Sequence, residues 1–121
     1  MLIPLLFGLL TAVPVVQVAE VPELTVSSAE AIALHLRKIN AKMYGAYWCP
    51  ACTRQREIFG DHAFQQVQYI ECDPRGINPK PQLCRRAGIQ VYPTWEIKGK
   101  KYQGVRSLAE LAELSGFMEG K

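Results

Sequence analysis

The sequence has little net charge, few histidines and no low-complexity stretch. These absences help to exclude several classes of protein. Its 121 residues carry 14 Lys and Arg against 11 Asp and Glu, a formal net charge of +3 with the two signs interspersed. A nucleic-acid-binding face needs a denser array of basic side chains, so we expect no nucleic-acid partner. No internal repeat is visible, and a hydrophobic content of 49% excludes a disordered chain. The length suits one domain and not two.

The sequence also lacks an evident metal site. Zinc ribbons use two close pairs of cysteines, and of the four cysteines here only Cys49 and Cys52 are close. Cys72 and Cys84 are well separated, and neither of the two histidines completes a ligand set. We therefore expect no metal, with zinc as the minor alternative. Four cysteines in a short chain are compatible with an oxidising compartment.

The first nineteen residues contain no charged side chain. As a helix, residues 1–19 would span about 28 Å, close to the hydrocarbon core of a bilayer. Pro4 and Pro14 weaken this prediction, and no basic residue precedes the apolar run as it would in a signal peptide. A membrane anchor or uncleaved signal, a cleaved signal, and the last span of a larger membrane protein remain open. Each would export the domain; a buried core helix is the alternative.

Residues 20–26 are typical of a linker, and residues 27–121 of one folded domain. Ser27 and Glu30 have the spacing of a capping box, so a helix is expected to begin at Ser27. The order that follows fits an α/β fold, a mixed four-stranded sheet with helices on both faces. The hydrophobic pattern predicts strands over 43–47, 67–72, 94–97 and 100–105, and further helices over 50–59, 82–87 and from Ser107 onward.

Two thiols one helical turn apart follow the first predicted strand, in Cys49-Pro50-Ala51-Cys52. Pro50 suits the first turn of a helix, which places Cys49 at its N-terminus. Unpaired N–H groups and the helix dipole favour a thiolate there, and a thiolate is the species that attacks disulfides. We expect Cys49 to be the exposed nucleophile and the more buried Cys52 the resolving thiol. This chemistry needs no cofactor.

Four other side chains are candidates for the site or its support. Trp48 is expected to flank the site at the surface, with a core aromatic as the alternative. Glu71, at a strand end, is expected to be a solvated acid. Cys72 and Cys84 are expected to form a second disulfide, which would stabilise the fold by roughly 3 kcal/mol by closing a loop rich in proline. A relay of electrons to or from the first pair is the alternative.

The cysteine motif, together with Tyr92-Pro93-Thr94-Trp95, resembles the thioredoxin superfamily. The resemblance implies a thioredoxin-like fold in which Pro93 is cis and faces the redox pair. It further implies that the backbone of Tyr92 binds an incoming extended segment, as in β-strand addition.

Four separated motifs within residues 28–117 carry a closer resemblance. They are Met43 to Pro50, Glu71 to Gly76, Tyr92 to Trp95, and Gly104 to Leu108. They are similar to one branch of that superfamily, the thioredoxin-like domain attached to bacterial and plastid homologues of vitamin K epoxide reductase. The resemblance implies that electrons pass from substrate thiols to a quinone-linked membrane partner, in the periplasm or the thylakoid lumen. It also implies a second cysteine pair at Cys72 and Cys84.

The chain departs from these patterns at two places beside the redox pair. The dipeptide between the cysteines is Pro50-Ala51 instead of Gly-Pro, and Met43 stands where thioredoxin carries a buried acid. The sequence shows no bundle of several spans, so the quinone chemistry is expected to reside in another chain or to be absent. We expect an exported enzyme that oxidises protein thiols. An extracytoplasmic disulfide reductase and a non-catalytic peptide-binding module remain alternatives.

Overall fold

The computed structural model describes residues 2–3, 8, 12–14 and 27–118. The predicted linker over residues 20–26, and most of the predicted anchor or signal over residues 1–19, lie outside this part. Within the described residues, no helix is long and apolar enough to cross a bilayer.

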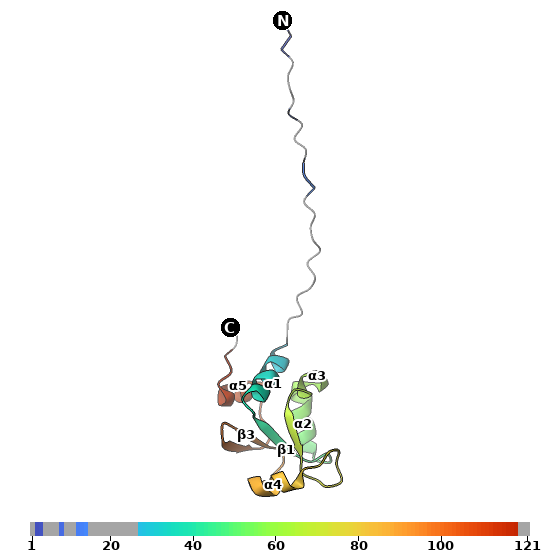
Figure 1. Ribbon diagram of the computed structural model, residues 1–121, viewed down its shortest axis with the longest axis vertical. Helices are drawn as coiled ribbons and strands as arrows, with labels where there is room; N and C mark the ends of the chain where they lie inside the picture. Colours follow the sequence, from blue (N-terminus) through green and yellow to red (C-terminus); the bar gives the residue numbers. More distant parts are fainter. Residues whose placement is uncertain (1, 4–7, 9–11, 15–26, 119–121) are drawn as a thin grey trace.

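The described chain folds around one mixed sheet of four strands, in the order β2-β1-β3-β4 (Figure 1). Strand β1 pairs in parallel with β2 and antiparallel with β3, and β4 pairs antiparallel with β3. The strands are β1 Lys42–Gly45, β2 Gln68–Glu71, β3 Thr94–Ile97 and β4 Lys100–Gln103. The helices are α1 Ser28–Lys38, α2 Pro50–Phe59, α3 Asp61–Phe64, α4 Pro81–Ala87 and α5 Leu108–Ser115.

The predicted order of elements is confirmed, with one addition and some shorter strands. Ser27 caps α1 by accepting a hydrogen bond from the Glu30 N–H at 3.1 Å, as its spacing predicts. Strand β1 ends two residues before the predicted Tyr47, because the chain turns there into α2. The short helix α3 was not predicted. Gly60, with φ 82°, redirects the chain between α2 and α3, and a single turn is too short to show a helical period.

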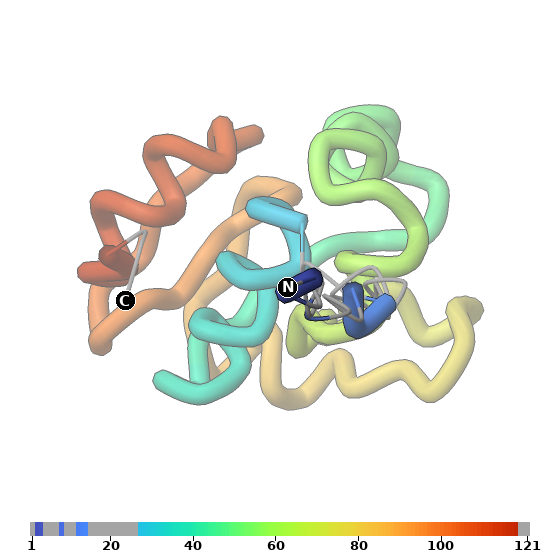
Figure 2. The backbone as a smooth tube through the Cα atoms, turned by 90° about the horizontal axis from the view of Figure 1, so that it is seen from above, coloured from blue at the N-terminus to red at the C-terminus, as the bar shows by residue number. Residues whose placement is uncertain are grey.

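Apolar side chains gather on both faces of the sheet. One face, which carries Met43 and Trp95, packs against α1, α2, α3 and α5 in the larger core cluster. Seen from above, α1 lies between α5 and the pair α2 and α3 (Figure 2). The opposite face carries Tyr44 and Ile70 and is covered by α4 in a smaller cluster. Helices on both faces of a mixed sheet are consistent with a thioredoxin-like fold.

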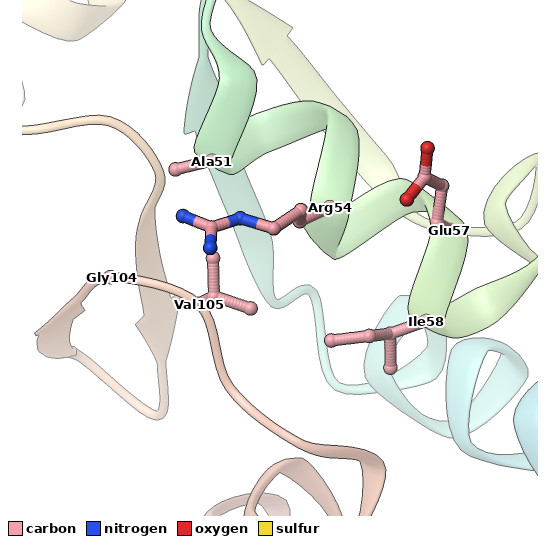
Figure 3. Close-up of a pocket in the computed structure, with 6 residues that line it drawn as sticks. All are labelled: Ala51, Arg54, Glu57, Ile58, Gly104 and Val105. Atoms are coloured by element: carbon pink, nitrogen blue, oxygen red, sulfur yellow. The ribbon is translucent and has the colours of Figure 1, made fainter.

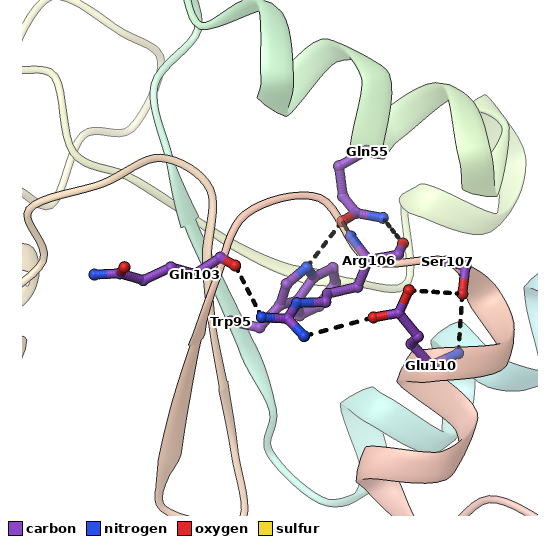
Figure 4. A network of polar contacts seen from close by, with 6 residues as sticks. All are labelled: Gln55, Trp95, Gln103, Arg106, Ser107 and Glu110. Carbon is purple, nitrogen blue, oxygen red and sulfur yellow. Dashed lines mark hydrogen bonds and ion pairs between the residues drawn. The ribbon is translucent and has the colours of Figure 1, made fainter.

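A fully buried glutamine on α2 holds this helix against the sheet. Gln55 Oε1 accepts hydrogen bonds from Trp95 Nε1 at 3.0 Å and from the Arg106 backbone N–H at 2.8 Å. Its Nε2 donates to the Arg106 carbonyl at 2.9 Å. The side chain of Arg106 in turn bonds the Gln103 carbonyl and Glu110, which fixes the segment between β4 and α5 (Figure 4). The helix that Cys49 caps and that carries Cys52 is therefore tied to β3.

Gln55→Ala is expected to destabilise the protein by about 3 kcal/mol, because it leaves one buried and two half-buried polar groups without partners and opens a cavity. Urea unfolding followed by circular dichroism would measure this loss. Thr53→Ala, on the exposed side of the same helix, is the matched control and should change stability far less. A loss below about 1 kcal/mol for Gln55→Ala would contradict the role given to this network.

Candidate active site

The N-terminus of α2 presents the sulfur of Cys49. Cys49 has extended backbone angles, φ −79° and ψ 117°, and acts as the N-cap of the helix. Its Sγ accepts a hydrogen bond from the Cys52 N–H at 3.3 Å, and Pro50 occupies the first helical position, where a missing N–H is harmless. The Cys49 side chain thus supplies the hydrogen-bond acceptor that the N-terminus of the helix needs.

Both thiols are free, and both are buried, Cys49 to 6% exposure and Cys52 to 5%. The expectation of an exposed Cys49 beside a more deeply buried Cys52 is therefore wrong. The physical reason lies in the loop before β3, whose backbone covers the Cys49 sulfur. The Cys49 thiol lies 3.6 Å from the carbonyl oxygen of Tyr92, to which it donates. A partner must displace part of this cover to reach the sulfur.

The two thiols differ in their electrostatic surroundings. Burial, followed by the Cys49 sulfur beside it, raises the pKa of Cys52 to about 12. Cys52 therefore keeps its proton at neutral pH. It is the thiol that needs help to ionise before it can attack a disulfide.

An aromatic pair borders the Cys49 sulfur. The Tyr92-Pro93 peptide bond is cis, and the Tyr92 carbonyl oxygen lies against the Cys49 sulfur. The side chain of Trp48 is 54% exposed, and its ring lies edge-on to the ring of Tyr92 with centroids 6.1 Å apart. The structure thus brings Tyr92 from the loop before β3 against Cys49 and its neighbour Trp48, with Pro93 next in the chain.

Asp73 is a member of this site that the sequence analysis missed. Its Oδ2 accepts a hydrogen bond from Trp48 Nε1 at 2.7 Å, and the Arg75 side chain forms an ion pair with the same carboxylate. Hydrogen bonds from Arg75 and then from Trp48 hold the pKa of Asp73 well below its usual range. Asp73-Pro74 indicates a turn in the sequence. No pattern of neighbouring residues, however, indicates that this turn contacts Trp48.

Cys72 and Cys84 form a disulfide that supports this turn from the opposite face of the sheet. The S–S bond is 2.04 Å long and joins the end of β2 to α4. Both sulfurs belong to the smaller cluster with Tyr44 and Ile70, whereas Cys49 and Cys52 belong to the larger cluster. The disulfide fixes the start of the loop that carries Asp73.

Glu71 is buried, at 4% exposure, so the expectation of a solvated acid is wrong. The loop that follows β2 folds over its side chain. The Asp73 N–H donates to Glu71 Oε2 at 3.2 Å, and the backbone of Gly76 packs so closely that a side chain there would collide with the carboxylate. Lys80 N–H closes the loop by donating to the Glu71 carbonyl at 2.8 Å.

A hollow of about 570 Å³ lies beside Ala51, which separates the two cysteines. Figure 3 shows α2 on one side of it and the segment after β4 on the other, with the Arg54 side chain extending towards Val105. The remaining lining includes Ile58 and Gly104. A mostly apolar hollow next to a reactive pair is suited to side chains of a protein partner.

Comparison with known proteins gives an informative relative. No family model matches the chain. The chain is 46% identical over 92 residues to the thiol-disulfide oxidoreductase LTO1 of Arabidopsis thaliana. The match covers 74% of this chain and 24% of the relative, so the chain spans about a quarter of that protein's length. This relative and the mixed sheet fit the thioredoxin superfamily.

Proposed function

We propose that this chain is a protein thiol–disulfide oxidoreductase whose redox pair is Cys49 and Cys52. The observation that carries the proposal is the placement of Cys49 as the N-cap of α2, with Cys52 one turn further in and the Tyr92-Pro93 backbone against the sulfur. The name of the 46% identical relative supports the same activity. Neither a metal nor an organic cofactor takes part in the exchange.

In the oxidising direction, a partner thiolate attacks the Cys49 sulfur of a Cys49–Cys52 disulfide. The S–S bond breaks, and Cys52 leaves with the electron pair and takes up a proton. A second partner thiolate then attacks the partner's own sulfur in the mixed disulfide, so that Cys49 leaves as a thiolate. The partner is oxidised by two electrons, and the chain now holds the two free thiols that the structure describes. Each step is a thiol–disulfide exchange.

The partner is proposed to enter as an extended segment between Trp48 and Tyr92. The Tyr92 carbonyl lies against the Cys49 sulfur and the Trp48 ring lies edge-on to the Tyr92 ring, so we expect binding to open these two contacts. Backbone groups of Tyr92, freed in this way, can pair with the segment as an added strand, and Pro93 orients them. The apolar hollow beside Ala51 would accept side chains of the same partner.

The finer assignments follow from the resemblance to domains attached to vitamin K epoxide reductase homologues. We propose an extracytoplasmic location, with membrane contact through residues 1–19 and re-oxidation by a quinone-linked membrane partner.

A reductant of extracytoplasmic disulfides is the second candidate function. The reduction potential separates the two: a value near −270 mV favours the reductant, and −120 to −180 mV the oxidant. A peptide-binding module without exchange activity is the third.

Cys52→Ala is expected to trap the physiological partner as a mixed disulfide on Cys49, because the thiol that resolves the complex is gone. Non-reducing electrophoresis and mass spectrometry of tagged protein, recovered from an oxidising compartment, would detect and identify the adduct. The double variant Cys49→Ser/Cys52→Ala is the matched control and should trap nothing. Equal recovery of partners by both variants would contradict covalent exchange and favour the peptide-binding module.

A further inference from the structure

Residues 73–91 contain the whole net charge of the chain. Their basic residues are Arg75, Lys80, Arg85 and Arg86, and their one acid is Asp73, which leaves a formal charge of +3. The complete chain has the same net charge, because of its 14 basic and 11 acidic residues ten of each lie elsewhere. A charge gathered in one short segment indicates a surface for a partner of the opposite sign.

The fold leaves three of these cations available to a partner. All four basic side chains of the segment are exposed. Asp73 neutralises Arg75, with Oδ2 at 3.0 Å from a guanidinium nitrogen. Within residues 27–118, no acidic side chain forms an ion pair with Lys80, Arg85 or Arg86. The segment thus presents three cations whose charge no acid in the described structure offsets by direct contact.

Helix α4 places two of these cations beside the redox site. The helix packs against the smaller cluster through the side that carries Leu83, which leaves Arg85 and Arg86 on its exposed side. Tyr92 packs against the same cluster, and its carbonyl oxygen lies 3.6 Å from the Cys49 sulfur. The exposed side of α4 therefore adjoins the part of the loop before β3 that meets the nucleophile.

The third cation lies among exposed apolar side chains. Lys80 lines a hollow of about 360 Å³ together with Tyr47 and Ile77, which are 53% and 86% exposed. Glu71 and Arg56 line the same hollow, and their formal charges offset one another. Aromatic and apolar side chains beside cations are typical of surfaces that bind polypeptides.

The fold favours a polypeptide over a membrane as the anionic partner. Figure 1 shows the start of α1, which follows the proposed linker, at the end of the domain opposite to α4. The seven residues 20–26 reach at most about 25 Å, whereas a domain of this size is roughly 30 Å across. The proposed anchor before residue 20 would therefore hold the α1 end near the bilayer and leave the α4 end facing away from it.

We propose that residues 73–91 recognise acidic side chains of the polypeptide whose thiols react with Cys49. The inference rests on the proposed exchange activity and names a class of substrate for it, an extended segment with Asp or Glu close to its cysteines. The carboxylates of this segment meet Lys80, Arg85 and Arg86 while its sulfur lies at Cys49. Attraction between opposite charges acts mainly on the rate of encounter, and salt screens it.

Exchange between the oxidised full chain and two synthetic peptides tests this recognition. Both peptides carry two cysteines, flanked by glutamates in one peptide and by lysines in the other. Each peptide gives two electrons and two protons to the Cys49–Cys52 disulfide and itself becomes a disulfide, which chromatography of quenched samples measures. At about 20 mM salt the acidic peptide is expected to react about tenfold faster than the basic one. At about 0.5 M salt the two rates should converge.

Arg85→Glu/Arg86→Glu should lower the ratio of the acidic to the basic rate by about tenfold or more, because the acidic peptide is slowed and the basic one accelerated. Lys38→Glu/Lys100→Glu is the matched control and should keep the wild-type ratio. Both lysines are exposed and lie where α1 and the β3–β4 hairpin reach the other end of the sheet, and their replacement changes the net charge equally. The peptide thiols ionise differently from each other, but every variant meets the same two peptides.

Three outcomes would count against these assignments. Equal rate ratios in the two double variants, or a wild-type ratio that salt leaves unchanged, overturn the recognition of acidic segments. Sedimentation with phosphatidylglycerol vesicles tests the membrane alternative. Binding to them that Arg85→Glu/Arg86→Glu abolishes, without selectivity between the peptides, assigns the surface to a bilayer and overturns the proposal. Failure of wild type to oxidise either peptide overturns the exchange activity itself.

Discussion

Cys49→Ser is expected to lose all disulfide exchange above the uncatalysed background. Serine also accepts a hydrogen bond as an N-cap, so the contact with the Cys52 N–H and the start of α2 should persist. The hydroxyl, however, cannot form a disulfide, and the remaining Cys52 is buried with its pKa raised to about 12. Oxidative refolding of a reduced, disulfide-containing protein, with the variant in place of wild type, would measure the loss.

Urea unfolding serves as the control for that experiment, because the variant should unfold close to the wild-type midpoint. Binding of the partner trapped by Cys52→Ala should also survive in Cys49→Ser, since the aromatic border and the apolar hollow are untouched. If exchange continues at an appreciable fraction of the wild-type rate, the nucleophile is a sulfur other than that of Cys49.

Cys72→Ser/Cys84→Ser is expected to destabilise the domain by about 3 kcal/mol, because the disulfide closes a loop between positions 12 residues apart. The loop itself buries little, and its contacts centre on Glu71 and Asp73. For a domain of this size, the urea midpoint should fall by roughly 1 to 3 M. Equilibrium unfolding under non-reducing conditions would measure it.

Dithiothreitol provides the matched control for the disulfide. It should lower the stability of wild type to that of the double variant and leave the double variant unchanged, because Cys49 and Cys52 are already free thiols. If the double variant keeps its stability but no longer supports turnover by the redox pair, the second pair has a relay role instead of a structural one.

The features that local sequence determines were predictable. Ser27 and Ser107 cap their helices through the residue three positions on, and Pro50 begins α2. These signals depend on neighbours in the chain, so the order of elements and the helix that presents Cys49 follow from them. The position of Pro93 directly before a strand is also a signal that neighbouring residues in the sequence provide.

The features that depend on distant segments were not predictable. Glu71 is buried because the loop through Gly76 folds back over it, and Cys49 is buried because the backbone of Tyr92 comes to lie against it. Gln55 lies on the buried side of α2 because its hydrogen-bond partners, Trp95 and the Arg106 backbone, come from segments distant in the sequence. A polar residue on the buried stripe of a short helix was the one sequence signal for this network.

The cover over the Cys49 sulfur has a consequence for the lifetime of the protein. Peroxides convert accessible thiolates to sulfenic and then to sulfinic and sulfonic acids, of which the last is beyond repair. At 6% exposure, and with the Tyr92 carbonyl oxygen 3.6 Å away, the Cys49 sulfur offers little surface to such small oxidants. The same cover that slows the entry of a partner would therefore slow the loss of this thiol to over-oxidation.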